Sequence, residues 1–188
     1  MDPSAITYVR HAMPVPDEAV PPSDWHLDAA ARAAAADLAD RLEVPQGIGA
    51  LVASTEPKAL ETAAAIGLRW QVEVVADDRL REAVRPWIGL GYRAAVHRYL
   101  RGEQLEGWEA HALVAARVGE AVRDAIRRAA GASVVVVSHG LALTLHLGER
   151  LGEAFDRESF WSGLAFPDAW ELDAAGMLHR RGSRTAAT

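Results

Sequence analysis

Five side chains that could bind a phosphate group or take part in its transfer lie where short apolar segments of this chain end. Arg10 and His11 follow the first segment, Lys58 lies just past the second, Glu82 follows the third and His139 the fourth. Cationic and imidazole groups together can bind a tetrahedral dianion, and a histidine can also act as a nucleophile. A glutamate beside them can protonate a departing alkoxide. The set predicts phosphoryl transfer through a phosphohistidine, without a metal ion or other cofactor.

The segments between these residues alternate between strand and helix signals. We expect strands at residues 5–9, 49–54, 71–76 and 133–138, helices at 28–42, 57–68, 110–130 and 140–151, and a terminal hairpin formed by 169–173 and 177–181. This order predicts a three-layer α/β/α sandwich with a mostly parallel central sheet. Ligands of such sheets bind beyond the carboxyl ends of the strands, where the five candidates lie. The glycine after His139 opens a helix, whose first backbone N–H groups would add to an anion site.

The composition excludes several functional classes. The 188 residues include no cysteine, which excludes disulfides, zinc–thiolate sites and cysteine nucleophiles. A net charge of −6 argues against a nucleic-acid partner. The longest apolar run, around residues 134–137, is too short to span a bilayer, and the first residues lack a secretion signal. We therefore expect a cytoplasmic protein with no membrane partner.

Four short motifs resemble, in order, those of the histidine phosphatase superfamily, in its phosphoglycerate-mutase-like branch. Residues 8–12 (YVRHA) resemble its Arg-His-Gly signature, and residues 54–63 (STEPKALETA) resemble its Ser-x-x-x-Arg-Ala-x-x-Thr-Ala motif. Residues 79–82 (RLRE) resemble its Leu-x-Glu motif, and residues 137–140 (VSHG) match its last motif. The resemblance extends over about residues 5–180 and implies the phosphoglycerate-mutase-like fold.

The resemblance also implies a role for each candidate residue. His11 would be the nucleophile that becomes phosphorylated, and Arg10 and His139 would hold the phosphoryl oxygens. Glu82 would protonate the leaving group and later activate water. Lys58 stands where the family usually has an arginine, so a point charge would replace a planar fork there. Asp17 stands where many members have asparagine, and we expect no phosphate-binding role for its carboxylate.

In this family a variable cap follows the glutamate motif, so we expect one domain over residues 1–188 with a small cap insertion at about 83–109. Residues 79–101 hold six arginines against one acid, Glu82, inside an acidic chain. They are either an ordinary solvated surface or a basic lid that attracts anionic substrates. Trp25, Trp87 and Trp108 lie near these loops and would add a flat apolar wall.

The function that these features favour is a phosphomonoesterase acting on a small phosphorylated metabolite. Mutases of the family tend to carry a longer insertion before the last histidine motif, so the short segment here favours hydrolysis. Two alternatives stay open: a phosphoglycerate-mutase-type isomerase, and a phosphate-binding module with weakened catalysis, of which Lys58 and Asp17 would be signs. The sequence does not identify the substrate or the oligomeric state, a homodimer included.

Overall fold

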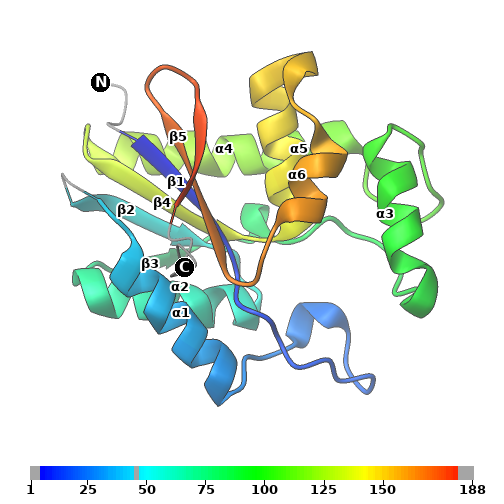
Figure 1. The fold of residues 1–188 in the computed structure, drawn as a ribbon, viewed down its shortest axis with the longest axis horizontal. Coiled ribbons are helices and arrows are strands. Elements are labelled where there is room, and N and C mark those ends of the chain that lie inside the picture. The colour runs from blue at the N-terminus through cyan, green and yellow to red at the C-terminus, as the bar shows by residue number, and fades with distance from the viewer. Residues whose placement is uncertain (1–4, 45–46, 182–188) are drawn as a thin grey trace, which may run out of the picture.

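The computed structural model describes residues 5–44 and 47–181 (Figure 1). Its strands are β1 (Ala5–Arg10), β2 (Ile48–Ala53), β3 (Val74–Ala76), β4 (Ser133–Ser138), β5 (Asp168–Asp173) and β6 (Leu178–Arg181). Its helices are α1 (Ala29–Arg41), α2 (Pro57–Trp70), α3 (Tyr92–Leu100), α4 (His111–Ala129), α5 (Gly140–Leu151) and α6 (Arg157–Gly163). None of the helices described is long and apolar enough to cross a membrane.

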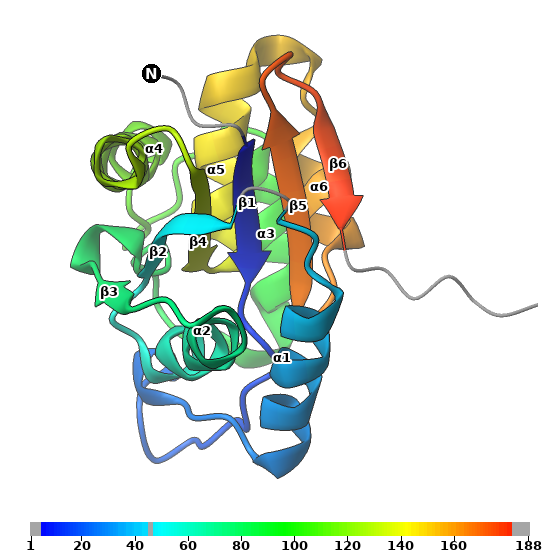
Figure 2. The same cartoon turned by 90° about the vertical axis from the view of Figure 1, so that its left-hand side faces the viewer.

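The strands form one six-stranded sheet in the order β3-β2-β4-β1-β5-β6 (Figure 2). The first four pair in parallel, and β5 and β6 are antiparallel at one edge. Alternate residues of β4 enter different cores, because successive side chains of a strand point to opposite faces. Val134 and Val136 pack with α4 and α5, whereas Val135 and Val137 pack with α1 and α2. The predicted three-layer sandwich with a mostly parallel sheet is confirmed (Figure 1).

Most element boundaries lie close to the predicted ones, and the differences have local causes. Asp28, the first residue of the predicted helix 28–42, accepts a hydrogen bond from the Ala31 amide and caps the start of α1. The third strand begins at Val74 rather than at residue 71, because Gln71 adopts a left-handed conformation with φ 53° that ends α2. The sequence did not predict α3 and α6, which are short and are held by packing against the rest of the chain.

The parallel register of β1, β4 and β2 brings three of the segments that follow the strands to one edge. Arg10 lies opposite Ser138 in the sheet, and the His11 amide donates to the Ser138 carbonyl at 3.1 Å. The Ser54 amide donates to the Val137 carbonyl at 2.9 Å. The residues after β1, β2 and β4 therefore start next to one another, as the rule for ligand sites in such sheets requires.

A histidine outside this edge makes the stability of the fold depend on pH. His146 lies inside α5, and its Nε2 is 3.1 Å from the buried Tyr8 hydroxyl. Burial, and next the charge of Arg150, lowers the pKa of His146 to about 4. The unfolded chain takes up a proton at this residue near pH 6.5, so acidification from there towards pH 4 favours unfolding.

We expect His146→Gln, which keeps a polar partner for Tyr8, to reduce this pH dependence. At about pH 5 the protonation of this one residue in the unfolded chain costs the wild type about 2 kcal/mol of stability. Urea unfolding at neutral pH and at about pH 5 measures the difference for each protein. Equal losses of unfolding free energy in wild type and variant would contradict the assignment.

Candidate active site

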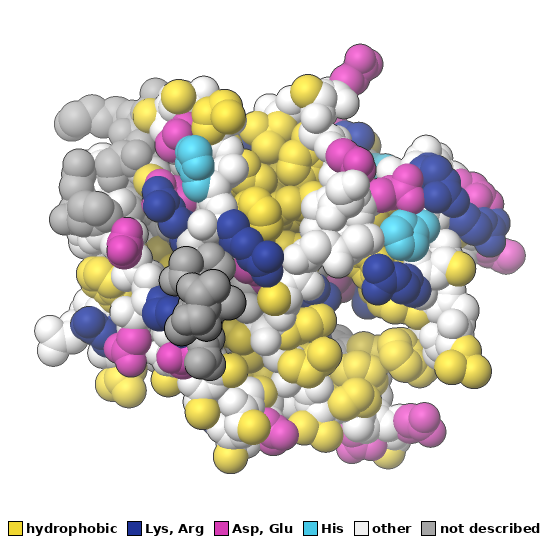
Figure 3. All heavy atoms as spheres, in the orientation of Figure 1, with side chains coloured by type: hydrophobic (Ala, Val, Ile, Leu, Met, Phe, Trp, Pro, Cys, Tyr) yellow, Lys and Arg dark blue, Asp and Glu magenta, His cyan; other side chains and the backbone are white. Residues whose placement is uncertain are grey.

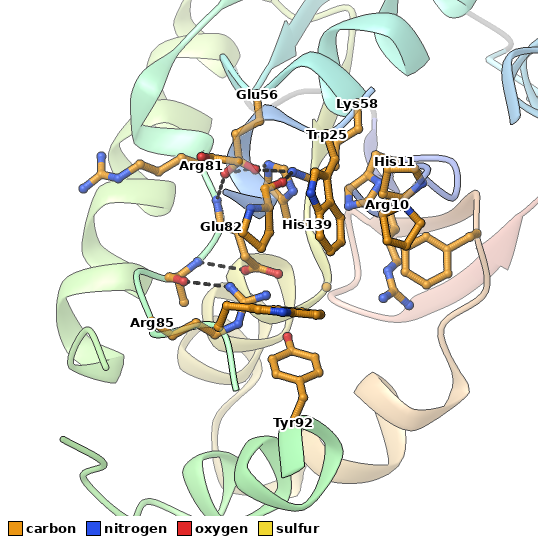
Figure 4. A pocket seen from close by; sticks show the side chains of 18 of the residues that line it. Arg10, His11, Trp25, Glu56, Lys58, Arg81, Glu82, Arg85, Tyr92 and His139 are labelled. Atoms are coloured by element: carbon orange, nitrogen blue, oxygen red, sulfur yellow. Dashed lines mark hydrogen bonds and ion pairs between the residues drawn. The ribbon is translucent and has the colours of Figure 1, made fainter. Parts of the chain in front are cut away.

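A pocket of about 690 Å³ opens at the carboxyl ends of β1, β2 and β4, and Figure 4 shows part of its lining. All five residues singled out in the sequence line it: Arg10, His11, Lys58, Glu82 and His139. They come from separate parts of the chain, and only the sheet brings them together. The remaining walls come from the loop of residues 13–25, the segment of residues 83–93 and the region of residues 161–166. Hydrophobic side chains gather over the first of these loops (Figure 3).

His11 is held so that one ring nitrogen is free to act as a nucleophile. Its Nδ1 lies 2.7 Å from the carbonyl oxygen of Ala12, which only accepts hydrogen bonds, so Nδ1 carries the proton. The lone pair is therefore on Nε2. Burial lowers the pKa of His11 to about 3, against the bond to Ala12, and the charges of Lys58 and Arg10 lower it further. At neutral pH the ring is uncharged, as a nucleophile must be.

His139 stands beside His11, with the two ring centroids 5.0 Å apart in an edge-on arrangement. Its Nε2 is 2.8 Å from the Ser54 hydroxyl. Its Nδ1 is buried and has no hydrogen-bond partner among the described residues. Burial, followed by the nearby His11 and Lys58, holds the pKa of His139 well below its ordinary value. An unpaired buried nitrogen is costly, and a phosphoryl oxygen would supply the missing partner.

Arg10 reaches the same place from the end of β1. One of its terminal nitrogens donates to the Leu164 carbonyl at 3.0 Å, and its guanidinium lies 3.4 Å from the centre of the Phe166 ring. Its Nε is buried without a partner among the described residues. Burial lowers the Arg10 pKa to about 10, with Glu82 acting in the opposite direction. Gly140 permits this approach, because a Cβ there would lie 3.3 Å from the guanidinium carbon.

Glu82 occupies the helix end that was expected to bind the anion. Its carboxylate accepts hydrogen bonds from the amides of Leu141 (3.2 Å) and Ala142 (2.9 Å) in the first turn of α5, and from Ala83 (2.9 Å). The negatively charged Glu82 carboxylate thus caps the N-terminus of α5, which is the positive end of the helix dipole. We expected these N–H groups to add to the phosphate site. Instead, the N–H groups of Leu141 and Ala142 bind the Glu82 carboxylate. Glu82 itself is held at the pocket wall.

These positions match a known family. A sequence profile of the histidine phosphatase superfamily (branch 1) matches residues 6–162, which hold all five candidates. The chain belongs to this superfamily, and it is a phosphatase. It is also 38% identical over 140 residues to the uncharacterised protein Rv0525 of Mycobacterium tuberculosis. That match covers 68% of this chain and 69% of Rv0525.

Several solved structures share the fold of this histidine phosphatase. The mycobacterial glucosyl-3-phosphoglycerate phosphatase Rv2419c is 22% identical, with a TM-score of 0.69 over 94% of this chain and 96% of that one. YhfR of Bacillus stearothermophilus is 23% identical, with a TM-score of 0.69 over 94% of each chain. A putative alpha-ribazole-5'-P phosphatase of Escherichia coli is 18% identical, with a TM-score of 0.67 over 100% of each chain.

Lys58 stands where the family motif usually has an arginine, and it is paired with the carboxylate of Glu56, which was not among the predicted site residues. Its ammonium bonds to the Glu56 carboxylate and, at 2.6 Å, to the Pro22 carbonyl. Glu56 also accepts from the Glu82 amide at 2.7 Å, and the same oxygen lies 3.5 Å from His139 Nε2. The only signal for it in the sequence is an acid two residues before the sole lysine. Glu56 therefore links three of the predicted residues (Figure 4).

We expect this histidine phosphatase to need a cation at position 58 but to accept arginine there. Lys58→Ala would leave the Glu56 carboxylate buried beside the phosphate without its partner. We expect kcat/KM to fall about 10- to 100-fold, the size of one charge-assisted hydrogen bond. Lys58→Arg should stay within a few-fold of wild type.

Steady-state kinetics and inhibition by inorganic phosphate measure both effects. The double variant Glu56→Gln/Lys58→Ala is the control, since it removes the unpaired charge and should recover part of the loss. An alanine variant with full kcat/KM would show that Lys58 does not contact phosphate.

The arginine-rich segment of residues 79–101 is mostly neutralised by acids from outside it. Arg79 pairs with Asp77 and Asp124, Arg81 with Asp78, Arg98 with Glu103, and Arg101 with Glu158. Arg85 and Arg93 line the pocket, and neither forms an ion pair with a carboxylate in the described part of the chain. The positive charge that this segment adds to the pocket therefore comes from Arg85 and Arg93 and not from all six of its arginines.

Other expectations for the site have mixed outcomes. Trp25 and Trp87 line the pocket, but Trp108 does not, because it is buried in the core below. Asp17 is exposed, and its carboxylate accepts from the Ala19 amide within its own loop. Over the residues that the structure describes, no group of three or more His, Cys, Asp or Glu is placed to hold a metal ion.

Proposed function

We propose that this chain is a metal-independent phosphomonoesterase that acts through a phosphohistidine at His11 on a small phosphorylated metabolite. One observation carries the proposal. The Ala12 carbonyl leaves the lone pair of His11 on Nε2, in a pocket where Arg10, Lys58 and His139 surround the same space. A neutral nucleophile beside the cations Arg10 and Lys58 suits attack on a phosphoryl dianion, whose charge these two cations offset.

In the first step, Nε2 of His11 attacks phosphorus as the bond from phosphorus to the ester oxygen breaks. Protonated Glu82 gives its proton to the departing oxygen, so an alcohol leaves and a carboxylate remains. In the second step that carboxylate takes a proton from water, and the hydroxide attacks the phosphohistidine. The P–N bond then breaks, inorganic phosphate leaves, and Glu82 is protonated again. Arg10, Lys58 and His139 hold the phosphoryl oxygens throughout.

Two relatives of the same fold support the small substrate. Their names state that one acts on glucosyl-3-phosphoglycerate and that the other is a putative phosphatase of alpha-ribazole-5'-phosphate. Both are phosphomonoesters of modest size. A pocket of about 690 Å³ is within the usual range for such ligands, roughly 300–1,000 Å³.

The test is phosphate release in the presence of a chelator. Wild-type protein is incubated with 4-nitrophenyl phosphate and with a panel of sugar, nucleotide and glycolytic phosphates in water enriched in ¹⁸O. We expect equal amounts of alcohol and phosphate, with one solvent oxygen in each phosphate. Movement of the phosphoryl group between positions of one substrate, without release, would favour the isomerase instead. Binding without turnover of any compound would favour the binding module.

A further inference from the structure

Four aromatic side chains form a continuous wall along the pocket, and the chemistry of phosphoryl transfer does not require them. Trp25, Trp87, Tyr92 and Trp161 all line it, although they come from three separate segments of the chain. The ring centroids are 5.3 Å apart from Trp25 to Trp87, 6.2 Å from Trp87 to Tyr92 and 6.4 Å from Tyr92 to Trp161. We refer to these four rings as the aromatic wall.

The aromatic wall is held in place rather than buried. The Trp25 indole donates to the Asp17 carbonyl at 2.9 Å. Tyr92 stacks on Trp108 beneath it, with centroids 6.4 Å apart and planes at 18°. Trp87 nevertheless keeps 52% of its surface exposed. Large rings that are fixed and still open to solvent are typical of a binding surface.

Two arginines complete the wall. The Arg85 guanidinium lies 4.8 Å from the centre of the Tyr92 ring, and that of Arg93 lies 5.8 Å from the centre of the Trp161 ring. These are cation–π distances, and such contacts orient the rings and keep the positive charge next to them. Tyr92 points its hydroxyl towards the site (Figure 4).

The rest of the outer lining is apolar and poor in neutral hydrogen-bonding groups. The loop of residues 13–25 contributes Met13, Pro14, Pro16, Pro21 and Pro22. Apart from Tyr92, the tryptophans and the two histidines of the site, Ser23 and Ser162 are the only uncharged residues of the described lining with a hydrogen-bonding side chain. A polyhydroxylated leaving group needs several such partners, because each hydroxyl that loses water without a new bond costs binding energy. A flat ring needs none.

From these contacts we infer that the alcohol released by this enzyme carries an aromatic ring, which lies against the aromatic wall. The inference rests on the proposed hydrolysis at His11 and adds the class of leaving group to it. Glu82 stands between the two regions, because it lines the same pocket between His139 and Arg85 (Figure 4). Glu82 can therefore protonate the ester oxygen of a substrate whose phosphoryl group lies near His11 and whose organic group lies near Trp87.

Three esters of unactivated alcohols test the inference: benzyl, cyclohexylmethyl and ethyl phosphate. Benzyl and cyclohexylmethyl alcohol are similar in size, so the comparison isolates the aromatic face. We expect kcat/KM for benzyl phosphate to exceed that for ethyl phosphate about tenfold or more. Its advantage over the cyclohexylmethyl ester should be about 2- to 12-fold, the range for an aromatic pair beyond its area.

Variants of Trp87 link the preference to the wall. Trp87→Ala should reduce the benzyl-to-cyclohexylmethyl ratio towards one, and Trp87→Phe should restore most of it. Leu90→Ala is the matched control, because Leu90 is exposed in the same segment but is absent from the pocket lining. It should keep the wild-type ratio.

The outcomes separate this inference from the function on which it rests. Hydrolysis with no preference for the benzyl ester, or a ratio that Trp87→Ala does not change, overturns the ring inference and leaves the phosphatase intact. Phosphate release from none of the esters overturns the proposed function instead. In that case calorimetry with benzylphosphonate and ethylphosphonate decides the ring inference: tighter binding of the benzyl compound supports it, and equal binding overturns it.

Discussion

Replacing His11 by alanine is expected to lower kcat about 10⁴-fold or more, because the variant has no group to take up the phosphoryl group. The His11 ring is buried and edge-on to His139, and its Nδ1 is hydrogen-bonded to the Ala12 carbonyl. Its loss therefore removes the nucleophile and leaves the surrounding cations in place. Phosphate should still bind, so the variant separates chemistry from binding.

Rapid mixing with a ³²P-labelled ester measures this directly. Wild type should show protein-bound label that is lost in acid and kept in alkali, as expected for a phosphorylated imidazole, and His11→Ala should show none. His179→Ala is the control, because His179 is exposed on β6 and pairs with Asp173 away from the pocket. Labelling in His11→Ala would move the nucleophile to another residue and contradict the proposed mechanism.

Replacing Glu82 by glutamine is expected to lower kcat for benzyl or ethyl phosphate by about 10²- to 10⁴-fold, the usual contribution of general acid–base catalysis. For 4-nitrophenyl phosphate the first step should be nearly unaffected, since 4-nitrophenolate leaves without a proton. The second step still needs a base for water, so phosphoenzyme should accumulate. The variant then gives a burst of nitrophenol equal to the enzyme concentration.

The structure also shows what else this substitution changes. The Glu82 carboxylate accepts three backbone hydrogen bonds, two of them from the first turn of α5, and glutamine has one acceptor oxygen for them. We expect a loss of stability of about 1 kcal/mol, as for other helix caps. Thermal unfolding shows whether the variant is folded at the assay temperature. Equal kcat on benzyl phosphate in folded variant and wild type would exclude Glu82 as the acid.

Much of the fold could be predicted because the strongest local signals coincide with its core. The run of valines in β4 is buried on both faces, as an apolar run without alternation indicates. Asp28 was expected to begin a helix and does so through its side chain. The segment of residues 83–109 was less predictable, because α3 lies among arginines and glycines and is held by its contacts with other elements.

The site divides in a similar way. His11, His139 and Arg10 stand at the ends of strands in a sheet that was predicted to be mostly parallel, so their meeting at one edge could be inferred too. Glu56 could not, because its role comes from contacts with Lys58, the Glu82 amide and His139, which are 2 to 83 positions away in the chain. Sequence spacing carries no information about such contacts unless a motif includes them.

By itself, then, the sequence determined which chemistry the chain can perform, because that depends on residue types at the ends of strands and on the absence of cysteine. The tertiary structure decided how those residues are used. It placed the lone pair of His11 on Nε2, paired Lys58 with Glu56, and set Glu82 on the end of α5. It also assembled the aromatic wall from three separate segments. Hydrogen-bond partners, burial and ring contacts arise between residues far apart in the chain, so only the folded arrangement specifies them.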